Sequence, residues 1–139
     1  MQHYVVGLFV VGDKTLMVEK SRGPDAVVGK LNGIGGKCGI GEMPLGCMER
    51  EFAEETGKVV YAYQWKGCGK LVNENWVVHF FIHHGEMFEQ PETNDVGERL
   101  HWVVWNDFPS RIVVPNLRWI FPLCMDEDVA KWEILDTSE

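Results

Sequence analysis

The sequence predicts an α/β (α+β) fold in which a mixed β-sheet carries packed helices. Two observations support this class. Apolar runs rich in β-branched and aromatic residues flank one strongly helical segment on both sides. The 139 residues, of which 45% are hydrophobic and 24% charged, have the size and composition of a globular unit with its own core. The chain contains no internal repeat, low-complexity tract or linker, so we expect a single domain over residues 1–139.

The first part of the chain predicts a β-hairpin. Tyr4–Val11 and Thr15–Glu19 are both rich in apolar residues, and the pair Gly12-Asp13 between them favours a tight turn. Ser21–Lys30 contains glycine and proline, which interrupt regular structure. We therefore expect two paired strands followed by a loop.

The segment Pro44–Thr56 predicts a helix. Pro44 suits the first turn of a helix, and Gly57 is a natural C-terminal stop. Apolar residues recur between them at helical spacing, at Leu45, Met48 and Phe52.

The rest of the chain predicts three more strands and short helices. The expected strands are the β-branched or aromatic runs Val59–Trp65, Trp76–Ile82 and Leu100–Trp105. The polar, acidic segment Gly85–Gly97 predicts a loop. Pro115–Met125 predicts a short helix interrupted at Pro122, and a second helix is expected to begin near Asp126.

The charge of the chain excludes several classes of partner. A net charge of -8 gives no general attraction to polymeric nucleic acid or to an anionic membrane. No apolar run has the length of a membrane span, and the N-terminus lacks the features of a signal peptide. The four cysteines are scattered without a CxxC pair, so we expect reduced thiols and a cytoplasmic location.

One face of the expected helix is acidic. Glu51, Glu54 and Glu55 fall within an arc of roughly 100° on a helical wheel. Arg50 lies at the edge of this arc, and one guanidinium cannot neutralise three carboxylates. The apolar stripe of the helix lies beside the arc, so we expect desolvation to strengthen the repulsion. A hard cation such as Mg²⁺ resolves this arrangement, because it binds carboxylate oxygens and shares its other positions with water and phosphate.

A glycine-rich run precedes the helix, with five glycines in residues 33–41. Glycines allow backbone groups to approach a ligand closely, and Lys37 within the run offers a positive charge to phosphate. By itself an acidic helix is most often a solvated surface, and a glycine cluster is most often a loop. Their joint spacing favours metal-assisted attack on a phosphoanhydride.

The joint spacing is also a known signature. The pattern G-x5-E-x7-R-E-U-x-E-E-x-G-U is formed by Gly36, Glu42, Arg50, Glu51, Phe52, Glu54, Glu55 and Gly57. It resembles the Nudix box of hydrolases that act on nucleoside diphosphates linked to another group. One position departs from the pattern, because Lys58 stands where the box ends on an apolar residue.

The resemblance implies a Nudix-type α/β/α sandwich with a mixed sheet and a catalytic loop–helix–loop. It implies that Mg²⁺, or Mn²⁺, is held by Glu51, Glu54, Glu55 and the carbonyl of Gly35. Glu51 and Glu55 would then be catalytic, and Arg50 would orient the carboxylates.

The resemblance also implies phosphate-binding residues and a further acid. Gly36 and Lys37 would meet the phosphates of the substrate. An acidic residue of a distant loop would join the metals or act as base; Glu98 fits this role best, and Glu92 and Asp95 remain open.

Two further segments suggest a substrate class. Gly29–Lys37 (GKLNGIGGK) looks like the MutT-type branch, whose members clear 8-oxo-dGTP, and Asn32 matches the asparagine that reads the base there. Residues 114–123 resemble the base-pocket segment of animal 8-oxo-purine triphosphatases, with Asn116 able to offer a donor and an acceptor to a purine. Asn32 also suits a turn, and Asn116 a helix N-cap. The expected reaction is cleavage of a nucleoside triphosphate to the monophosphate and pyrophosphate.

Other functions stay open at this point. The chain could be a Nudix hydrolase of ADP-ribose or a dinucleoside polyphosphate, or a non-catalytic nucleotide-binding regulatory module. We expect a monomer or a homodimer. Three tryptophans would form either a dimer face or part of the core: Trp65, Trp76 and Trp132.

Overall fold

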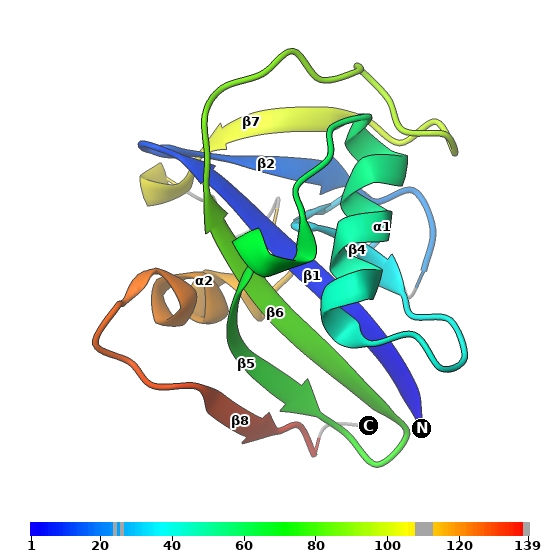
Figure 1. Cartoon of the computed structure of the whole chain (residues 1–139), viewed down its shortest axis with the longest axis vertical. Helices are drawn as coiled ribbons and strands as arrows, with labels where there is room; N and C mark the ends of the chain where they lie inside the picture. Colours follow the sequence, from blue (N-terminus) through cyan, green and yellow to red (C-terminus); the bar gives the residue numbers. More distant parts are fainter. Residues whose placement is uncertain (24, 26, 108–112, 138–139) are drawn as a thin grey trace.

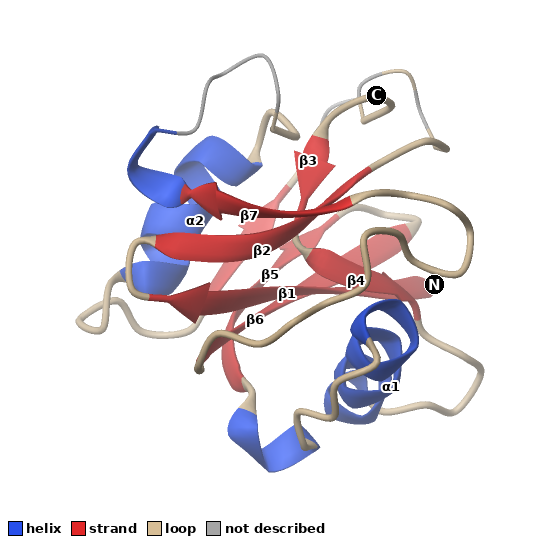
Figure 2. Cartoon of the chain, turned by 90° about the horizontal axis from the view of Figure 1, so that it is seen from above, coloured by secondary structure: helices blue, strands red, loops and turns tan. Residues whose placement is uncertain are grey.

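The computed structural model describes residues 1–23, 25, 27–107 and 113–137, which form one mixed sheet with helices on both faces (Figures 1 and 2). Its strands in these residues are β1 (Gln2–Val11), β2 (Lys14–Glu19), β3 (Leu31–Asn32), β4 (Ile34–Lys37), β5 (Lys66–Val72), β6 (Trp76–His84), β7 (Leu100–Val104) and β8 (Trp132–Leu135). The helices are α1 (Pro44–Thr56) and α2 (Leu117–Met125), with 3₁₀ turns η1 (Ala62–Gln64) and η2 (Trp105–Asp107). The strand order is β3-β2-β1-β6-β5-β8, with β4 also on β1 and β7 also on β2.

β1 lies at the centre of this sheet. It runs parallel to β6 and antiparallel to β2 and β4. Its even-numbered residues from Val6 to Val10 are buried on one face, while Val5 and Phe9 are buried on the other. A strand covered on both faces reads as a continuous apolar run, which is why the sequence shows no alternation here.

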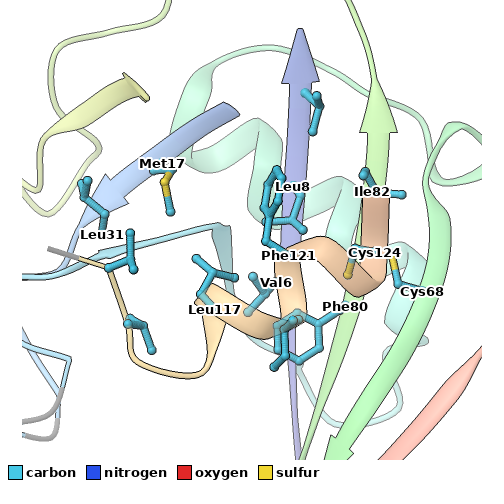
Figure 3. Close-up of a cluster of buried hydrophobic side chains, with 14 of the residues drawn as sticks. Val6, Leu8, Met17, Leu31, Cys68, Phe80, Ile82, Leu117, Phe121 and Cys124 are labelled. Atoms are coloured by element: carbon cyan, nitrogen blue, oxygen red, sulfur yellow. The ribbon is translucent and has the colours of Figure 1, made fainter. Parts of the chain in front are cut away.

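The two helices cover opposite faces of the sheet, as Figure 2 shows. One core packs α1 against the sheet through Cys47, Met48 and Phe52. The other packs α2 against the opposite face, where Leu117 and Phe121 meet the even side of β1 (Figure 3). The expected α/β/α arrangement with a mixed sheet is therefore confirmed.

The hairpin and the central helix form where the sequence predicts them. β1 and β2 pair antiparallel, and Gly12 in the turn has a φ of 59°. α1 spans the predicted residues and ends at Gly57, whose φ of 76° is the left-handed conformation that glycine adopts without strain. One detail differs, because Leu45 is 39% exposed instead of joining Met48 in the core.

The prediction of a strand at Val59–Trp65 is wrong. The chain forms an irregular segment and the turn η1 there, and β5 begins only at Lys66. Only Val60 and Trp65 are buried, and each anchors the segment to the core beside α1. The Ala62 N–H donates to the Glu49 carboxylate of α1 at 3.1 Å, which holds the segment against the helix instead of in the sheet.

Strand β5 contains two glycines and resembles a loop in sequence. At Gly69 a Cβ atom would overlap the Trp132 side chain of the neighbouring β8, so the parallel pairing of these strands requires a glycine. The helix expected near Asp126 is absent from the described residues 126–137, where a turn leads into β8 instead. α2 also continues through Pro122 without the expected interruption and ends three residues later.

The glycine-rich run is strand in part, where a loop was expected. Ile34–Lys37 forms β4, paired with Tyr4–Gly7 of β1. At Gly35 a Cβ atom would overlap the carbonyl oxygen of Val5, so only glycine lets the two backbones come this close. The expected loops at residues 21–30 and 85–97 contain no helix and no extended strand in their described residues.

The three tryptophans belong to the core and its margins. Trp65 is 4% exposed, while Trp76 and Trp132 are partly buried against the α2 core. Within the part of the chain that the structure describes, no helix has both the length and the apolar character needed to span a bilayer.

Candidate active site

The acidic face of α1 lies at the edge of the core, as its spacing predicts. Met48 and Phe52 are fully buried under the helix. The Glu51 side chain, one position before Phe52, is therefore only 13% exposed, and Glu55 is also half-buried. Glu54 points further out and is 54% exposed. The structure thus separates two partly desolvated carboxylates from one that is solvated.

Arg50 organises this face. Its guanidinium donates to both oxygens of Glu42 at 2.7 and 2.8 Å, to Glu51 at 3.1 Å and to Glu54 at 3.1 Å. It also donates to the carbonyl oxygen of Lys37 at 3.1 Å, which ties the helix to the end of β4. One side chain therefore fixes the positions of three carboxylates and of the glycine-rich strand.

Glu42 is the main ion-pair partner of Arg50. Hydrogen bonds from Arg50 and from the Gly39 N–H lower the pKa of Glu42 to about 2, so this carboxylate is ionised at any physiological pH. The two hydrogen bonds of this bidentate pair are the shortest that Arg50 makes to a carboxylate. The sequence pattern contained Glu42, but only the structure shows that it anchors the arginine.

Glu51 and Glu55 lie where the ionised form of a carboxylate is unfavourable. Burial raises the pKa of Glu51, although the neighbouring Arg50 opposes this shift. Burial raises the pKa of Glu55 to about 7, against the stabilising effects of an Asn94 hydrogen bond and of Lys20. Both groups are carboxylates held where ionisation costs free energy, and this is the environment that a bound cation relieves.

The loop before β7 adds a second layer to the site. Glu98 is 3% exposed and accepts hydrogen bonds from the Ser21 N–H at 2.6 Å and from the Asn94 amide at 3.2 Å. The same Asn94 amide lies 3.4 Å from Glu55, so it links Glu98 to the helix. Glu92 and Asp95, the other acids considered in this loop, are exposed.

Glu98 differs from Glu55 in its electrostatics. Burial by itself would raise its pKa, but the donors of Ser21 and Asn94 and the charge of Lys20 outweigh burial and lower it. Glu98 is therefore an anion with its lone pairs engaged by donors. Sequence reasoning missed Asn94, whose only signal was its position four residues before Glu98.

The glycines of β4 leave room for the acidic face. A Cβ atom at Gly36 would lie 2.6 Å from the Glu51 carboxyl carbon. Glycine at this position thus lets the Glu51 carboxylate rest directly over the strand. Gly35 lies beside it in β4, and the Lys37 side chain is exposed at the end of the strand.

Asn32 and Asn116 belong to two segments that are paired through their backbones. Leu31 of β3 forms a β-bridge with Val113, and the Val114 N–H donates to the Leu31 carbonyl at 2.9 Å. Asn32 accepts a hydrogen bond from its own neighbour, the Gly33 N–H, as a turn residue would. Asn116 occupies the N-cap position of α2, but its side chain makes no capping hydrogen bond.

The departure at Lys58 has a local explanation. Its ammonium group lies 5.0 Å from the centre of the Phe88 ring, and Val60 takes the buried position two residues later.

A cavity of about 530 Å³ lies away from the acidic face, between β5 and the segment from α2 to β8. None of the four residues predicted to be catalytic, Arg50, Glu51, Glu55 and Glu98, lines it.

Comparison with solved structures supports the fold. A MutT protein from Bacillus halodurans matches with a TM-score of 0.77 and 21% identity over 99% of this chain and 91% of that one. An ADP-ribose pyrophosphatase from Streptococcus suis matches with a TM-score of 0.66 and 17% identity over 97% and 98%. A bifunctional NMN adenylyltransferase/ADP-ribose pyrophosphatase from Francisella tularensis, complexed with AMP and a manganese ion, matches with a TM-score of 0.69 and 18% identity over 91% and 41%.

Comparison of the sequence with families of domains identifies the family of the chain. No curated protein matches the chain. The family described as NUDIX domain matches residues 1–123, which include every strand but β8 and all the residues of the acidic face. The chain therefore belongs to the Nudix family.

Proposed function

We propose that this protein is a metal-dependent pyrophosphohydrolase that cleaves a nucleoside triphosphate to the monophosphate and pyrophosphate. The observation that carries the proposal is the pair of half-buried carboxylates, Glu51 and Glu55, both with raised pKa values. Glu51 rests over Gly36 of β4, and Glu55 faces Asn94. Such a pair is costly in a metal-free protein and useful in one that binds a cation.

The donor set fits a hard divalent cation. Its side chains offer only carboxylate oxygens, which Mg²⁺ and Mn²⁺ prefer over nitrogen or sulfur. We assign the cation to Glu51, Glu54, Glu55 and the carbonyl of Gly35. When bound, the ion supplies neutralisation of phosphate charge and activation of water.

The chain's own residues orient the reactants. Arg50 holds Glu51 and Glu54 in place through its hydrogen bonds, and the exposed Lys37 would offer its ammonium group to the phosphates. Glu55 lies four residues after Glu51 on the same face of α1. Where it is not fully used as a ligand, it is the candidate to accept a proton from the attacking water. Glu98 would act through Asn94, which it holds against Glu55.

The base would be read by asparagines. The Asn116 side-chain amide takes no part in capping α2. The Asn32 side-chain oxygen accepts a hydrogen bond from the Gly33 N–H, and its amide N–H groups can donate to a base. A purine edge presents both donors and acceptors, which two asparagine amides can match. An oxidised purine such as that of 8-oxo-dGTP is within this chemistry.

The test is product analysis with purified protein, Mg²⁺ and a panel of common and oxidised nucleoside triphosphates. We expect monophosphate and pyrophosphate, and a loss of kcat of at least about 100-fold in Glu51→Gln with little change in KM. Glu49→Gln is the matched control on the same helix, since glutamine keeps the oxygen that accepts from Ala62. Absence of turnover with every triphosphate would refute the assignment of substrate.

ADP-ribose is the second candidate substrate, because the structure from Streptococcus suis with which this chain shares its fold is described as an ADP-ribose pyrophosphatase. Adding ADP-ribose and a dinucleoside polyphosphate to the same panel separates these activities. Tight nucleotide binding by calorimetry without any turnover would instead identify a regulatory module.

Two further expectations belong to this proposal. All four cysteines are free thiols, which fits a cytoplasmic protein, and fractionation of the source cells would test the location. Sedimentation would distinguish the monomer from the homodimer.

A further inference from the structure

A second cluster of potential ligands lies next to the acidic face. The Sγ atoms of Cys38 and Cys47 and a carboxylate oxygen of Glu42 all lie within 4.8 Å of one another. Cys38 directly follows β4, Glu42 lies in the connecting loop, and Cys47 lies in the first turn of α1. The thiols are 7% and 0% exposed, whereas the Glu42 side chain is 22% exposed and opens the cluster to solvent.

The backbone fixes the three ligands in place. The Cys38 N–H donates to the His3 carbonyl at 2.9 Å, which ties Cys38 to β1. Glu42 and Gly39 exchange two hydrogen bonds, from the Glu42 N–H at 3.1 Å and from the Gly39 N–H to the Glu42 carboxylate at 2.9 Å. Cys47 is held by the helix. These hydrogen bonds and the helix bring the three ligands together.

The spacing and the donor types fit a thiophilic ion. With Zn–S bonds of about 2.3 Å and tetrahedral angles, two thiolate sulfurs lie about 3.8 Å apart. The observed separations, within 4.8 Å, need to contract by no more than about 1 Å, which side-chain rotation can supply. Mg²⁺ avoids thiolates, so this set of donors selects a different class of ion from the one proposed for Glu51 and Glu55.

We propose that Cys38, Cys47 and Glu42 form a second metal site, which binds Zn²⁺ or another thiophilic divalent cation. The ion replaces the two thiol protons, which pass to solvent, and water completes the tetrahedron. No electron is transferred. Two thiolates and a carboxylate give the site a larger negative charge than the Arg50 guanidinium beside it can cancel.

Occupation of this site would disturb the acidic face. Glu42 now binds Arg50 at 2.7 and 2.8 Å, and an Arg50 nitrogen lies 3.8 Å from the Cys47 sulfur. A cation held by Glu42 and Cys47 competes for that carboxylate and repels the guanidinium. Arg50 would then lose the anchor from which it orients Glu51 and Glu54. A cation in this site would therefore inhibit hydrolysis. This consequence rests on the proposed function, whereas the binding of the cation does not.

The test of binding is titration of the full-length protein with Co²⁺ at saturating Mg²⁺. We expect an ultraviolet thiolate-to-cobalt charge-transfer band that saturates at one equivalent and disappears when Zn²⁺ is added. Cys38→Ala and Cys47→Ala should lose the band. Cys68→Ala is the matched control, because Cys68 and Cys124 form a second buried thiol pair that lacks a carboxylate among its partners. The proposal would be overturned if the wild type gave no band, or if Cys38→Ala and Cys47→Ala gave a band as strong as that of the wild type.

A measurement on the wild type covers the case in which the variants do not fold. Because all four cysteines are buried, the reaction is followed in urea below the unfolding transition, where transient opening of the structure exposes them. Zn²⁺ should slow alkylation of Cys38 and Cys47 by iodoacetamide, read by peptide mass spectrometry, with Cys68 and Cys124 as internal references. Equal alkylation of all four with and without Zn²⁺ would refute the site.

Activity then tests the coupling. With Mg²⁺ in excess, Zn²⁺ should lower kcat about tenfold in the wild type and much less in Cys38→Ala. A tenfold loss is typical when a residue that hydrogen-bonds to a metal ligand, here Arg50, is displaced. Equal inhibition of both proteins would place the zinc at the catalytic carboxylates and reject the coupling. If no nucleotide is turned over, the cobalt spectrum still decides whether the site exists.

Discussion

Replacing Glu55 with glutamine should stabilise the metal-free protein at neutral and alkaline pH. Burial, together with the charges of Glu51 and Glu98, makes the ionised form of Glu55 costly, while Asn94 and Lys20 offset only part of this cost. Glutamine has the same shape and keeps an oxygen for the Asn94 amide, but it carries no charge. The substitution therefore removes an unfavourable term with little change in packing.

The magnitude follows from the pKa of Glu55, which is raised from 4.5 to about 7 in the folded protein. A tenfold change in acidity corresponds to about 1.4 kcal/mol, so the folded state loses about 3 kcal/mol on this ionisation. Between these two pKa values the folded chain binds more protons than the unfolded chain, and its stability falls as pH rises. The gain of Glu55→Gln should thus be near zero below pH 4.5 and reach about 3 kcal/mol above pH 7.

The assay is urea unfolding followed by tryptophan fluorescence in the presence of a chelator, at several pH values across this range. Glu54→Gln is the control, because this carboxylate is 54% exposed, and we expect a change within about 0.5 kcal/mol at every pH. Saturating Mg²⁺ should reverse the order near pH 8, since only the wild type keeps the full set of ligands. In the presence of the chelator, a stability difference that is constant with pH, or a Glu55→Gln variant less stable than the wild type near pH 8, would refute the claim that the Glu55 carboxylate is desolvated.

Three other substitutions test separate parts of the structure. Gly36→Ala should lower kcat at least about tenfold, because its methyl group would lie 2.6 Å from the Glu51 carboxyl carbon; full activity in the folded variant would contradict this. Gly46→Ala, whose methyl group meets no atom within 4 Å, should raise the free energy of unfolding by about 1 kcal/mol and leave kcat unchanged in steady-state kinetics; lower stability would argue against the helix packing. Glu98→Gln should lower the free energy of unfolding by about 2 kcal/mol at neutral pH, because the carboxylate accepts the Ser21 N–H at 2.6 Å. Since folding lowers the pKa of Glu98, urea unfolding at acid pH should show a smaller loss, and a loss that is independent of pH would count against its ionised state.

Two segments form a structure other than the one their composition favours, and the cause is the same in both. Val59–Trp65 has the composition of a strand, yet Val60 and Trp65 serve as anchors to the α1 core and the segment between them turns. β5 has the composition of a loop, yet its Gly69 faces the Trp132 side chain and must be small. In both places contacts between distant residues outweigh local propensity.

The candidate site was predictable wherever it lies within one helix. The arc of Glu51, Glu54 and Glu55 follows from helical geometry, and so does the place of Arg50 at its edge. The partners that come from other elements were not predictable: Glu42 as the anchor of Arg50, and Asn94 as the link from Glu98 to Glu55. No spacing along the chain encodes a contact between residues 39 positions apart.

By itself the sequence determined the class of fold, the bounds of the central helix and the residue types of the acidic face, because these depend on periodicity and on chemistry carried by neighbouring residues. The tertiary structure decided which carboxylates are desolvated, which acid is linked to them, and that two cysteines converge on Glu42. Burial and electrostatic energy depend on every group that surrounds a charge, and most of those groups come from other parts of the chain.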